Sequence, residues 1–196
     1  MTQSFIDFLA ASPSAFHAAA NVAERLEDTG FSRSVSLDDD AHAPGGHYIE
    51  RDGAVVAWWV PEGAHPRFRV VGSHTDSPGF KLKPNPATVT ADGWVQAGVE
   101  VYGGPLLNSW LDRELRFAGR LALDDGTQVL AATGPVGRIP QLAIHLDREV
   151  NEGLTLKRQR HTNPVVGALA PRGEGAGEAE ADGLAARVPG DVLTAL

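Results

Sequence analysis

Apolar and polar residues alternate with helical spacing over the first thirty positions. Apolar side chains recur within residues 5–9, a Ser-Pro-Ser segment interrupts them, and a second apolar stripe follows with charged residues on the opposite face. We expect Ser12 to cap this second helix, Pro13 to occupy its first position and Gly30 to follow its end. The stripe consists of Phe16, Ala19, Ala20, Ala23 and Leu26.

The pattern then changes to one typical of strands. Residues 47–61 contain two apolar runs joined by Asp52-Gly53, and an Asp-Gly pair in this position is a strong signal for a β-hairpin. Residues 67–73 form another apolar run and predict a third strand. A helix followed by a hairpin and a strand indicates one flank of an α/β or α+β sheet.

From Thr88 onward, short β-type runs replace the helical pattern. They lie at 88–104, 115–132 and 137–147, and Ala-Asp-Gly and Asp-Asp-Gly supply turns. The proline-rich residues 83–87 precede them and suggest a seam between two parts of the chain.

This seam predicts two regions. Residues 1–86 form an α/β part and residues 87–196 form a β-rich part. Residues 170–183 are rich in glycine, alanine and glutamate, which favours an exposed loop or linker.

Composition narrows the function classes. The chain has 25 acidic and 17 basic residues and a formal net charge of −8, so we expect neither nucleic acid nor an anionic membrane as a partner. The chain contains no cysteine, and any metal must therefore be held by His, Asp or Glu. The N-terminus lacks a basic region before its apolar stretch, so we expect a cytoplasmic protein without a secretory signal.

The candidate chemistry lies in the sequence Ser-His-Thr-Asp-Ser-Pro directly after the predicted strand 67–73. The end of that strand would bring His74 to the edge of the sheet where α/β proteins bind ligands. Asp76 follows two residues later, near enough to accept a hydrogen bond from the imidazole N–H that faces away from a metal. From the residues alone, a surface turn that happens to contain a histidine remains the alternative.

Four stretches of the chain resemble the aspartyl aminopeptidase family, whose members are zinc metallopeptidases. Residues 72–84 (GSHTDSPGFKLKP) are similar to its first metal motif, and residues 99–121 to its Tyr-Gly-Gly…Trp-Phe-Asp-Arg-Asp-Leu…Ala-Gly-Arg signature. Residues 138–153 resemble its Ile-Pro…Leu-Ala-Ile-His-Leu segment, and residues 12–18 its N-terminal Ser-Pro-Ser-x-Phe-His-Ala. The departures are Ser109, Leu111 and Glu114, where the family commonly has threonine, phenylalanine and aspartate.

The resemblance implies roles for individual residues. His74 would bind zinc in a two-metal centre, and Asp76 would be the catalytic carboxylate behind it. His145 would enter the active site of a neighbouring subunit, where it contacts the substrate carbonyl or a metal; we favour the substrate role. Without the resemblance, His145 in an alternating apolar strand would be a core or interface histidine.

The residues at 112–114, although tempting as ligands, match the family's oligomerisation domain. We expect Asp112, Arg113 and Glu114 to form a structural ion-pair cluster. For the remaining histidines we expect surface or capping positions; they are His17, His42, His47, His65 and His161.

The family's fold implies an incomplete catalytic α/β sheet followed by a β-rich oligomerisation domain. The Arg-Leu-Asp-Asn and Glu-Glu-Val-Gly segments and the C-terminal histidine that supply the family's other ligands and its glutamate base are not found in this sequence. We therefore expect a metallo-aminopeptidase that uses a zinc-activated water to remove N-terminal residues, preferentially acidic ones, from peptides. We expect this chain to be inactive alone.

The implied cofactor is zinc, with cobalt or manganese as alternatives for a site of histidine and carboxylate ligands. The implied partners are a peptide with a free N-terminus and either further copies of the chain in a dimer-based homo-oligomer or full-length subunits. A non-catalytic assembly module derived from such an enzyme is the second hypothesis.

Overall fold

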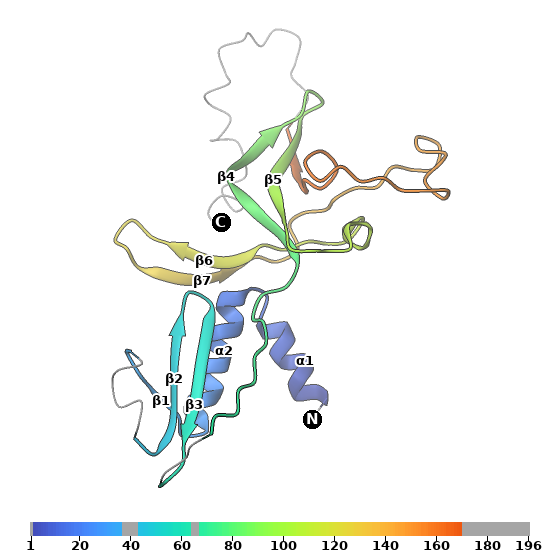
Figure 1. Cartoon of the computed structure of the whole chain (residues 1–196). Coiled ribbons are helices and arrows are strands. Elements are labelled where there is room, and N and C mark those ends of the chain that lie inside the picture. The colour runs from blue at the N-terminus through green and yellow to red at the C-terminus, as the bar shows by residue number, and fades with distance from the viewer. Residues whose placement is uncertain (1, 37–42, 64–66, 170–196) are drawn as a thin grey trace. The chain divides into compact units, whose positions relative to one another are not determined.

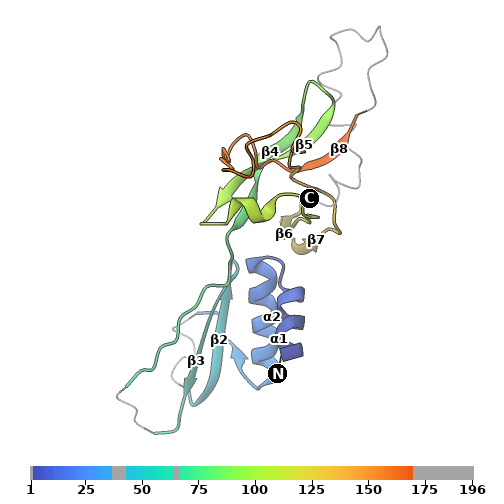
Figure 2. The same cartoon turned by 90° about the vertical axis from the view of Figure 1, so that its right-hand side faces the viewer.

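The chain forms two compact units in a computed structural model that describes residues 2–36, 43–63 and 67–169. The first unit contains the residues up to Ser77 together with 118–130, and the second contains 78–117 and the residues from 131 onward. Figures 1 and 2 show helices and several small sheets, so the prediction of a mixed α/β fold is confirmed. The sequence predicted a domain boundary between residues 86 and 87, whereas the compact units meet between Ser77 and Pro78. The domain boundary stays a prediction.

Two helices begin the first unit, α1 (Thr2–Ala11) and α2 (Ala15–Asp28). The N-cap of α2 is Ser14 rather than the predicted Ser12, because Ser14 has an extended backbone and its hydroxyl accepts a hydrogen bond from the amide of His17. His17 thus belongs to the cap, as expected. Gly30 follows the helix with a φ of +87°, the left-handed conformation that favours glycine there.

A three-stranded sheet completes the core of this unit: β1 (Ser32–Arg33), β2 (Gly45–Arg51) and β3 (Ala54–Val60). The hairpin of β2 and β3 confirms the prediction, and both turn residues have positive φ, +47° at Asp52 and +81° at Gly53. Such a turn matches the twist of the two strands. The sheet packs against α2, whose buried residues are Ala18, Ala19 and Ala23.

Two polar side chains are buried on β2. Tyr48 is 1% exposed and donates a hydrogen bond to the carboxylate of Glu27, and burial, followed by this contact, raises its pKa to about 12. His47 is 8% exposed and stacks on Trp58, with ring centroids 5.6 Å apart. The expected surface position of His47 is therefore wrong, because β2 turns this side chain toward an aromatic neighbour. His42 and His65 lie outside the described residues.

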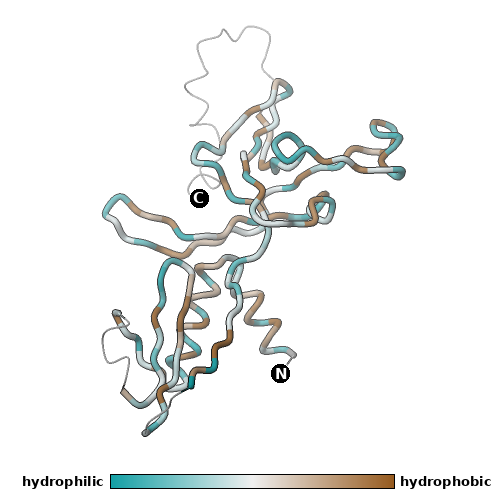
Figure 3. Tube along the Cα trace, in the orientation of Figure 1, coloured by the Kyte–Doolittle hydropathy of each residue, from teal (hydrophilic) through white to brown (hydrophobic). Residues whose placement is uncertain are grey.

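The predicted strand at 67–73 does not form. The segment is extended but belongs to no strand, and Phe68, Val70 and Val71 are 94%, 88% and 97% exposed. Figure 3 shows hydrophobic residues along it. A strand exists only where a neighbour shares its backbone hydrogen bonds, and no described segment pairs with this one.

A second hairpin, of β6 (Ala118–Ala122) and β7 (Gln128–Ala132), confirms the β-type run predicted at 115–132. Residues 118–130 of it belong to the first unit, where β6 contacts α2. Arg120 lies over the ring of Phe16 and its Nη1 is 2.8 Å from Asp52 Oδ1. This pair ties β6 to the β2–β3 turn.

The second unit contains β4 (Gly79–Val89), β5 (Trp94–Tyr102), the 3₁₀ helix η1 (Leu107–Trp110) and β8 (Val165–Ala168). The strands form one antiparallel sheet in the order β4–β5–β8. The proline-rich residues 83–87 lie inside β4, where its pairing with β5 shifts register, and not between two elements. The buried residues of this unit include Val95, Ala97, Val99, Ile139 and Thr162.

The run predicted at 137–147 is β-type only at its start. Arg138 bridges Val165, Ile139 bridges Leu111, and the following residues form loops and turns. Apolar alternation in this run does not produce a strand, because none of the strands in the described ranges continues beside it. The loop predicted at 170–183 lies outside the described residues.

Candidate functional site

The segment of His74 is held in place by its neighbours in the first unit. Thr75 donates a hydrogen bond from Oγ1 to the carbonyl oxygen of Gly53, over 2.7 Å, and thereby attaches the segment to the β2–β3 turn. The sequence predicted that His74 lies at the end of a paired strand. In the structure, a contact between two turns holds its segment instead. The local consequence is the same: an imidazole at the end of an apolar run is presented outward.

The imidazole of His74 has one fixed nitrogen and one exposed face. Its Nδ1 lies 2.5 Å from the backbone oxygen of Asp76, and the side chain is 77% exposed. A carbonyl oxygen only accepts, so Nδ1 carries the proton and the lone pair of the neutral ring is on Nε2. This is the tautomer that a metal-binding histidine uses when a backbone carbonyl orients it.

The orienting atom differs from the predicted one. The sequence suggested the Asp76 carboxylate as the acceptor, whereas the hydrogen bond goes to the Asp76 backbone and the carboxylate Oδ1 lies 3.9 Å from His74 Nδ1. A carbonyl two residues ahead is within reach in so tight a turn. The catalytic role of Asp76 stays a prediction.

The described residues do not assemble a zinc site. No group of three histidine, aspartate or glutamate side chains in the described ranges is placed to hold a metal ion. His74 offers one ligand of suitable chemistry, and zinc in a catalytic centre requires three from the protein. The described residues therefore fit a part of a metal centre that provides one histidine ligand.

His145 lies in the second unit, on an exposed turn instead of the predicted strand. The amides of Leu146 and Asp147 donate to the carbonyl of Ala143, which closes the turn. Its apolar neighbours do not pack inward: Leu142, Ile144 and Leu146 are 59%, 44% and 74% exposed. A histidine among exposed leucine and isoleucine side chains suits a contact with another molecule more than a role in the core.

Asp112 has a different role from the ion-pair cluster that the sequence suggested. No ion pair in the described part of the chain includes Asp112, Arg113 or Glu114. Instead, the Asp112 amide donates to the carbonyl of Ile139 over 2.9 Å, and its Oδ1 accepts from the amide of Gln141 over 3.2 Å. Asp112 has a φ of +53°, which aspartate tolerates better than most residues.

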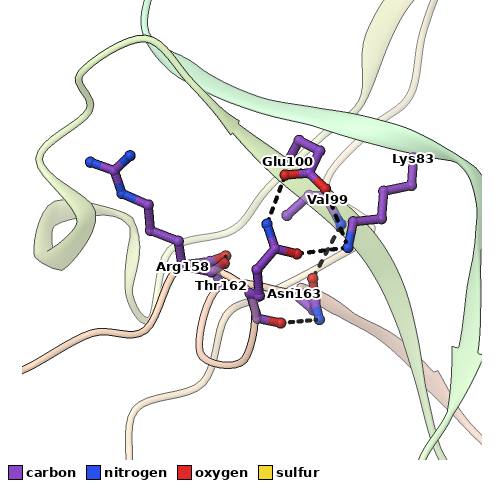
Figure 4. A network of polar contacts seen from close by, with 7 residues as sticks. Lys83, Val99, Glu100, Arg158, Thr162 and Asn163 are labelled. Carbon is purple, nitrogen blue, oxygen red and sulfur yellow. Dashed lines mark hydrogen bonds and ion pairs between the residues drawn. The ribbon is translucent and has the colours of Figure 1, made fainter.

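A second group of polar side chains holds the residues that follow His145 (Figure 4). Lys83 Nζ lies 2.8 Å from Gln159 Oε1, and Gln159 Nε2 donates to Glu100 over 2.7 Å. Lys83 and Glu100 also form an ion pair of 3.4 Å. The sequence did not reveal this group, since Lys83 and Gln159 are 76 positions apart and no motif joins them. His161 is exposed and accepts from the amide of Lys157, as expected of a capping histidine.

A shallow hollow of about 350 Å³ in the first unit does not contain the candidate residues. Four of its charged side chains form ion pairs, Arg33 with Glu50 and Arg120 with Asp52, and Arg51 donates a hydrogen bond to the carbonyl oxygen of Val35. Among the described residues, no helix has the length and apolar character that crossing a bilayer requires.

A family model described as "Aminopeptidase I zinc metalloprotease (M18)" matches residues 8–190. The chain belongs to this family. The resemblance drawn from the four sequence stretches is thereby confirmed. A curated relative from Streptomyces avermitilis, "Probable M18 family aminopeptidase 2", is 54% identical over 170 residues. The match covers 85% of this chain and 39% of the relative.

A relative of the same name from Mycobacterium tuberculosis H37Rv is 42% identical over 195 residues, which cover 91% of this chain and 44% of the relative. This M18 chain thus spans about two fifths of the length of the curated relatives it matches, 39% and 44%.

Solved structures agree with this assignment. The one described as "Cryo-EM structure of the Ape4 and Nbr1 complex" has a TM-score of 0.77 at 34% identity, over 85% of this chain and 34% of that one. The "Structure of S. cerevesiae mApe1 dodecamer" has a TM-score of 0.63 at 30% identity, over 83% and 37%. An aminopeptidase from Thermotoga maritima, with a TM-score of 0.74 at 23% identity over 89% and 40%, supports the fold alone.

Proposed function

We propose that this chain supplies part of the active site of a zinc-dependent aminopeptidase that removes N-terminal, preferentially acidic, residues from peptides. The observation that carries the proposal is the geometry of His74. Within the region that matches the M18 family, its Nδ1 is bound to the Asp76 backbone and its Nε2 lone pair is available on an exposed ring. A histidine that binds a metal through Nε2 has this arrangement.

Each candidate residue has a separate role in this proposal. His74 holds one metal of a two-metal centre, and the Asp76 segment fixes its ring. His145, from a neighbouring copy in a homo-oligomer, donates a hydrogen bond to the oxygen of the substrate carbonyl and stabilises the negative charge that develops there. Zinc, when bound, polarises that carbonyl and activates water. Cobalt or manganese suits the same ligands.

The remaining ligands and the general base come from outside the residues described here. This agrees with the share of the Streptomyces avermitilis relative that the chain covers, 39%. We therefore expect no turnover from the 196-residue chain alone, with or without added zinc. The check is an assay of the purified chain with aspartyl p-nitroanilide and zinc or cobalt; sustained turnover would contradict the proposal that other residues complete the site.

A chimaera provides the complementary test. Residues 1–190 of this chain replace the matching part of the Streptomyces avermitilis relative, which keeps its own remaining sequence. We expect the chimaera to bind zinc and hydrolyse the substrate, with the unaltered relative as the positive control. A folded chimaera that binds zinc but has no activity would oppose the proposed role.

The second candidate function is a non-catalytic assembly module. It is favoured by the exposed apolar residues around His145, namely Leu142, Ile144 and Leu146. Under this alternative the chain forms defined oligomers by itself, and the chimaera is assembled but inactive. Light scattering together with the activity assay separates the two candidates.

A further inference from the structure

The segment that carries His145 is a long excursion from the sheet of the second unit. We call residues 140–163 the His145 arm. The two ends of the arm are close, because Arg138 and Val165 exchange backbone hydrogen bonds of 2.9 and 2.8 Å. Between them the arm contains turns and no strand. Figure 1 shows it leaving the β4–β5–β8 sheet as an extended loop.

The outgoing limb of the arm is attached at Asp112. The backbone bridge between Leu111 and Ile139 brings Asp112 beside the start of the arm. There its carboxylate accepts a hydrogen bond from the amide of Gln141, four residues before His145. The acceptor is a carboxylate, which makes this bond charge-assisted. It links residues 29 positions apart, so it is a tertiary contact and not part of a local turn.

The return limb of the arm, residues 158–163, is attached to β4 and β5. Gln159 bridges Lys83 and Glu100, with 2.8 and 2.7 Å between the bonded atoms. Asn163 Oδ1 accepts from the amide of Val99 over 3.1 Å, and thus takes the place of a strand partner where β8 no longer pairs with β5. Figure 4 shows Lys83 and Glu100 of the two strands near Asn163 of the arm.

The turn between the limbs has little else to place it. His145 and the apolar residues on either side of it are exposed, and within the described part of the chain the turn is closed by local hydrogen bonds to Ala143. Few buried contacts mean a low free energy for local opening. The position of the imidazole in the isolated chain therefore depends on how firmly the two limbs are held.

We propose that Asp112 and the Lys83–Glu100–Gln159 group are positioning residues of the aminopeptidase, which hold the two limbs of the arm and so place His145 for its contact with substrate. This inference rests on the proposed function. Neither site touches the reacting atoms; both act through the backbone of the arm. Misplacing a hydrogen-bond donor lowers the rate of the chemical step more than it weakens substrate binding.

The first experiment measures amide hydrogen exchange at residues 141–147 in the 196-residue chain, which needs no activity. Asp112→Ala is expected to raise exchange there about tenfold, since one charge-assisted bond is lost. Asp112→Asn keeps an oxygen acceptor and tolerates the positive φ, so it is expected to restore most of the protection. Asp112→Gly removes the carboxylate without placing a Cβ in that conformation, and should resemble the alanine variant.

The control is Asp125→Ala. Asp125 also accepts a backbone hydrogen bond, from Thr127 over 2.8 Å, but lies in the β6–β7 turn of the first unit. It should leave exchange at 141–147 unchanged. Equal exchange in wild type and Asp112→Ala would overturn the proposal for the outgoing limb. If Asp112→Ala does not fold, Gln159→Ala tests the return limb by exchange at 158–163.

The second experiment uses the chimaera. Asp112→Ala is expected to lower kcat about tenfold with KM nearly unchanged, and Asp112→Asn to recover it. Faster exchange without any fall in kcat, while His145→Ala has a strongly lowered kcat, would overturn the positioning role. Full activity of His145→Ala would instead contradict the proposed function of His145 and leave the exchange result standing, so the two failures are distinguishable.

Discussion

The segments of His74 and His145 hold their imidazoles in opposite ways. At His74 the ring is fixed, by the Asp76 backbone 2.5 Å from Nδ1, while the preceding residues 67–73 are exposed and unpaired. At His145 no hydrogen bond from the described residues fixes the exposed ring, while the backbone on both sides is attached through Asp112 and Gln159.

This difference corresponds to two kinds of chemistry. A metal ligand needs its lone pair directed and its tautomer fixed, which a carbonyl two residues away provides. A group that reaches a substrate in another subunit needs its backbone placed, which requires contacts distributed along a loop. The predictions below test whether the two histidines separate in this way.

The largest effect is expected for His74→Ala in the chimaera. Removing a zinc ligand removes the Lewis acid and the activated water, so kcat/KM should fall about a thousandfold or more. Steady-state kinetics with aspartyl p-nitroanilide measures it, with Asp125→Ala as the surface control that stays near wild type. Activity within tenfold of wild type would end the ligand role.

A smaller effect, by about a hundredfold in kcat, is expected for His145→Ala, since one hydrogen bond to the developing oxyanion is lost. The fall should leave KM and the zinc content nearly unchanged, and here His145 differs from His74. Zinc content measured on the same preparations tests the distinction. Loss of zinc in His145→Ala would show that this side chain binds metal instead.

The smallest effect is expected for the pH dependence of amide hydrogen exchange in the return limb. The hydrogen bond from Gln159, and then Lys83, lowers the pKa of Glu100 below its usual 4.5. The attachment is therefore complete above that usual value and is lost as the pH falls through the lowered pKa. Exchange at 158–163, corrected for its intrinsic pH dependence, should rise in that acidic range. Glu100→Gln should remove this pH dependence, and an unchanged profile would contradict the account.

The sequence predicted those features whose causes are local. The hairpin of β2 and β3 depends on Asp52-Gly53 and two apolar runs, and α2 on its apolar stripe, and both are present. The outward position of His74 also depends on residues next to it. Even here the details differ: Ser14 rather than Ser12 caps α2, and the Asp76 carbonyl rather than its carboxylate binds the ring.

The features that the sequence did not predict depend on distant partners. Residues 67–73 have the composition of a strand, yet no described strand lies beside them to pair with. Residues 140–147 alternate like a strand but form a loop, because no described strand continues beside them after the bridge at Ile139. Asp112 was expected in an ion-pair cluster, and only the tertiary contact with Gln141 reveals its role.

The most direct test of the account is the zinc content of the chimaera and its His74→Ala variant, measured by mass spectrometry after dialysis against dilute zinc. The account predicts that the substitution removes about one equivalent of zinc per subunit while the fold, monitored by circular dichroism, is kept. An unchanged zinc content in the folded His74→Ala variant would contradict it.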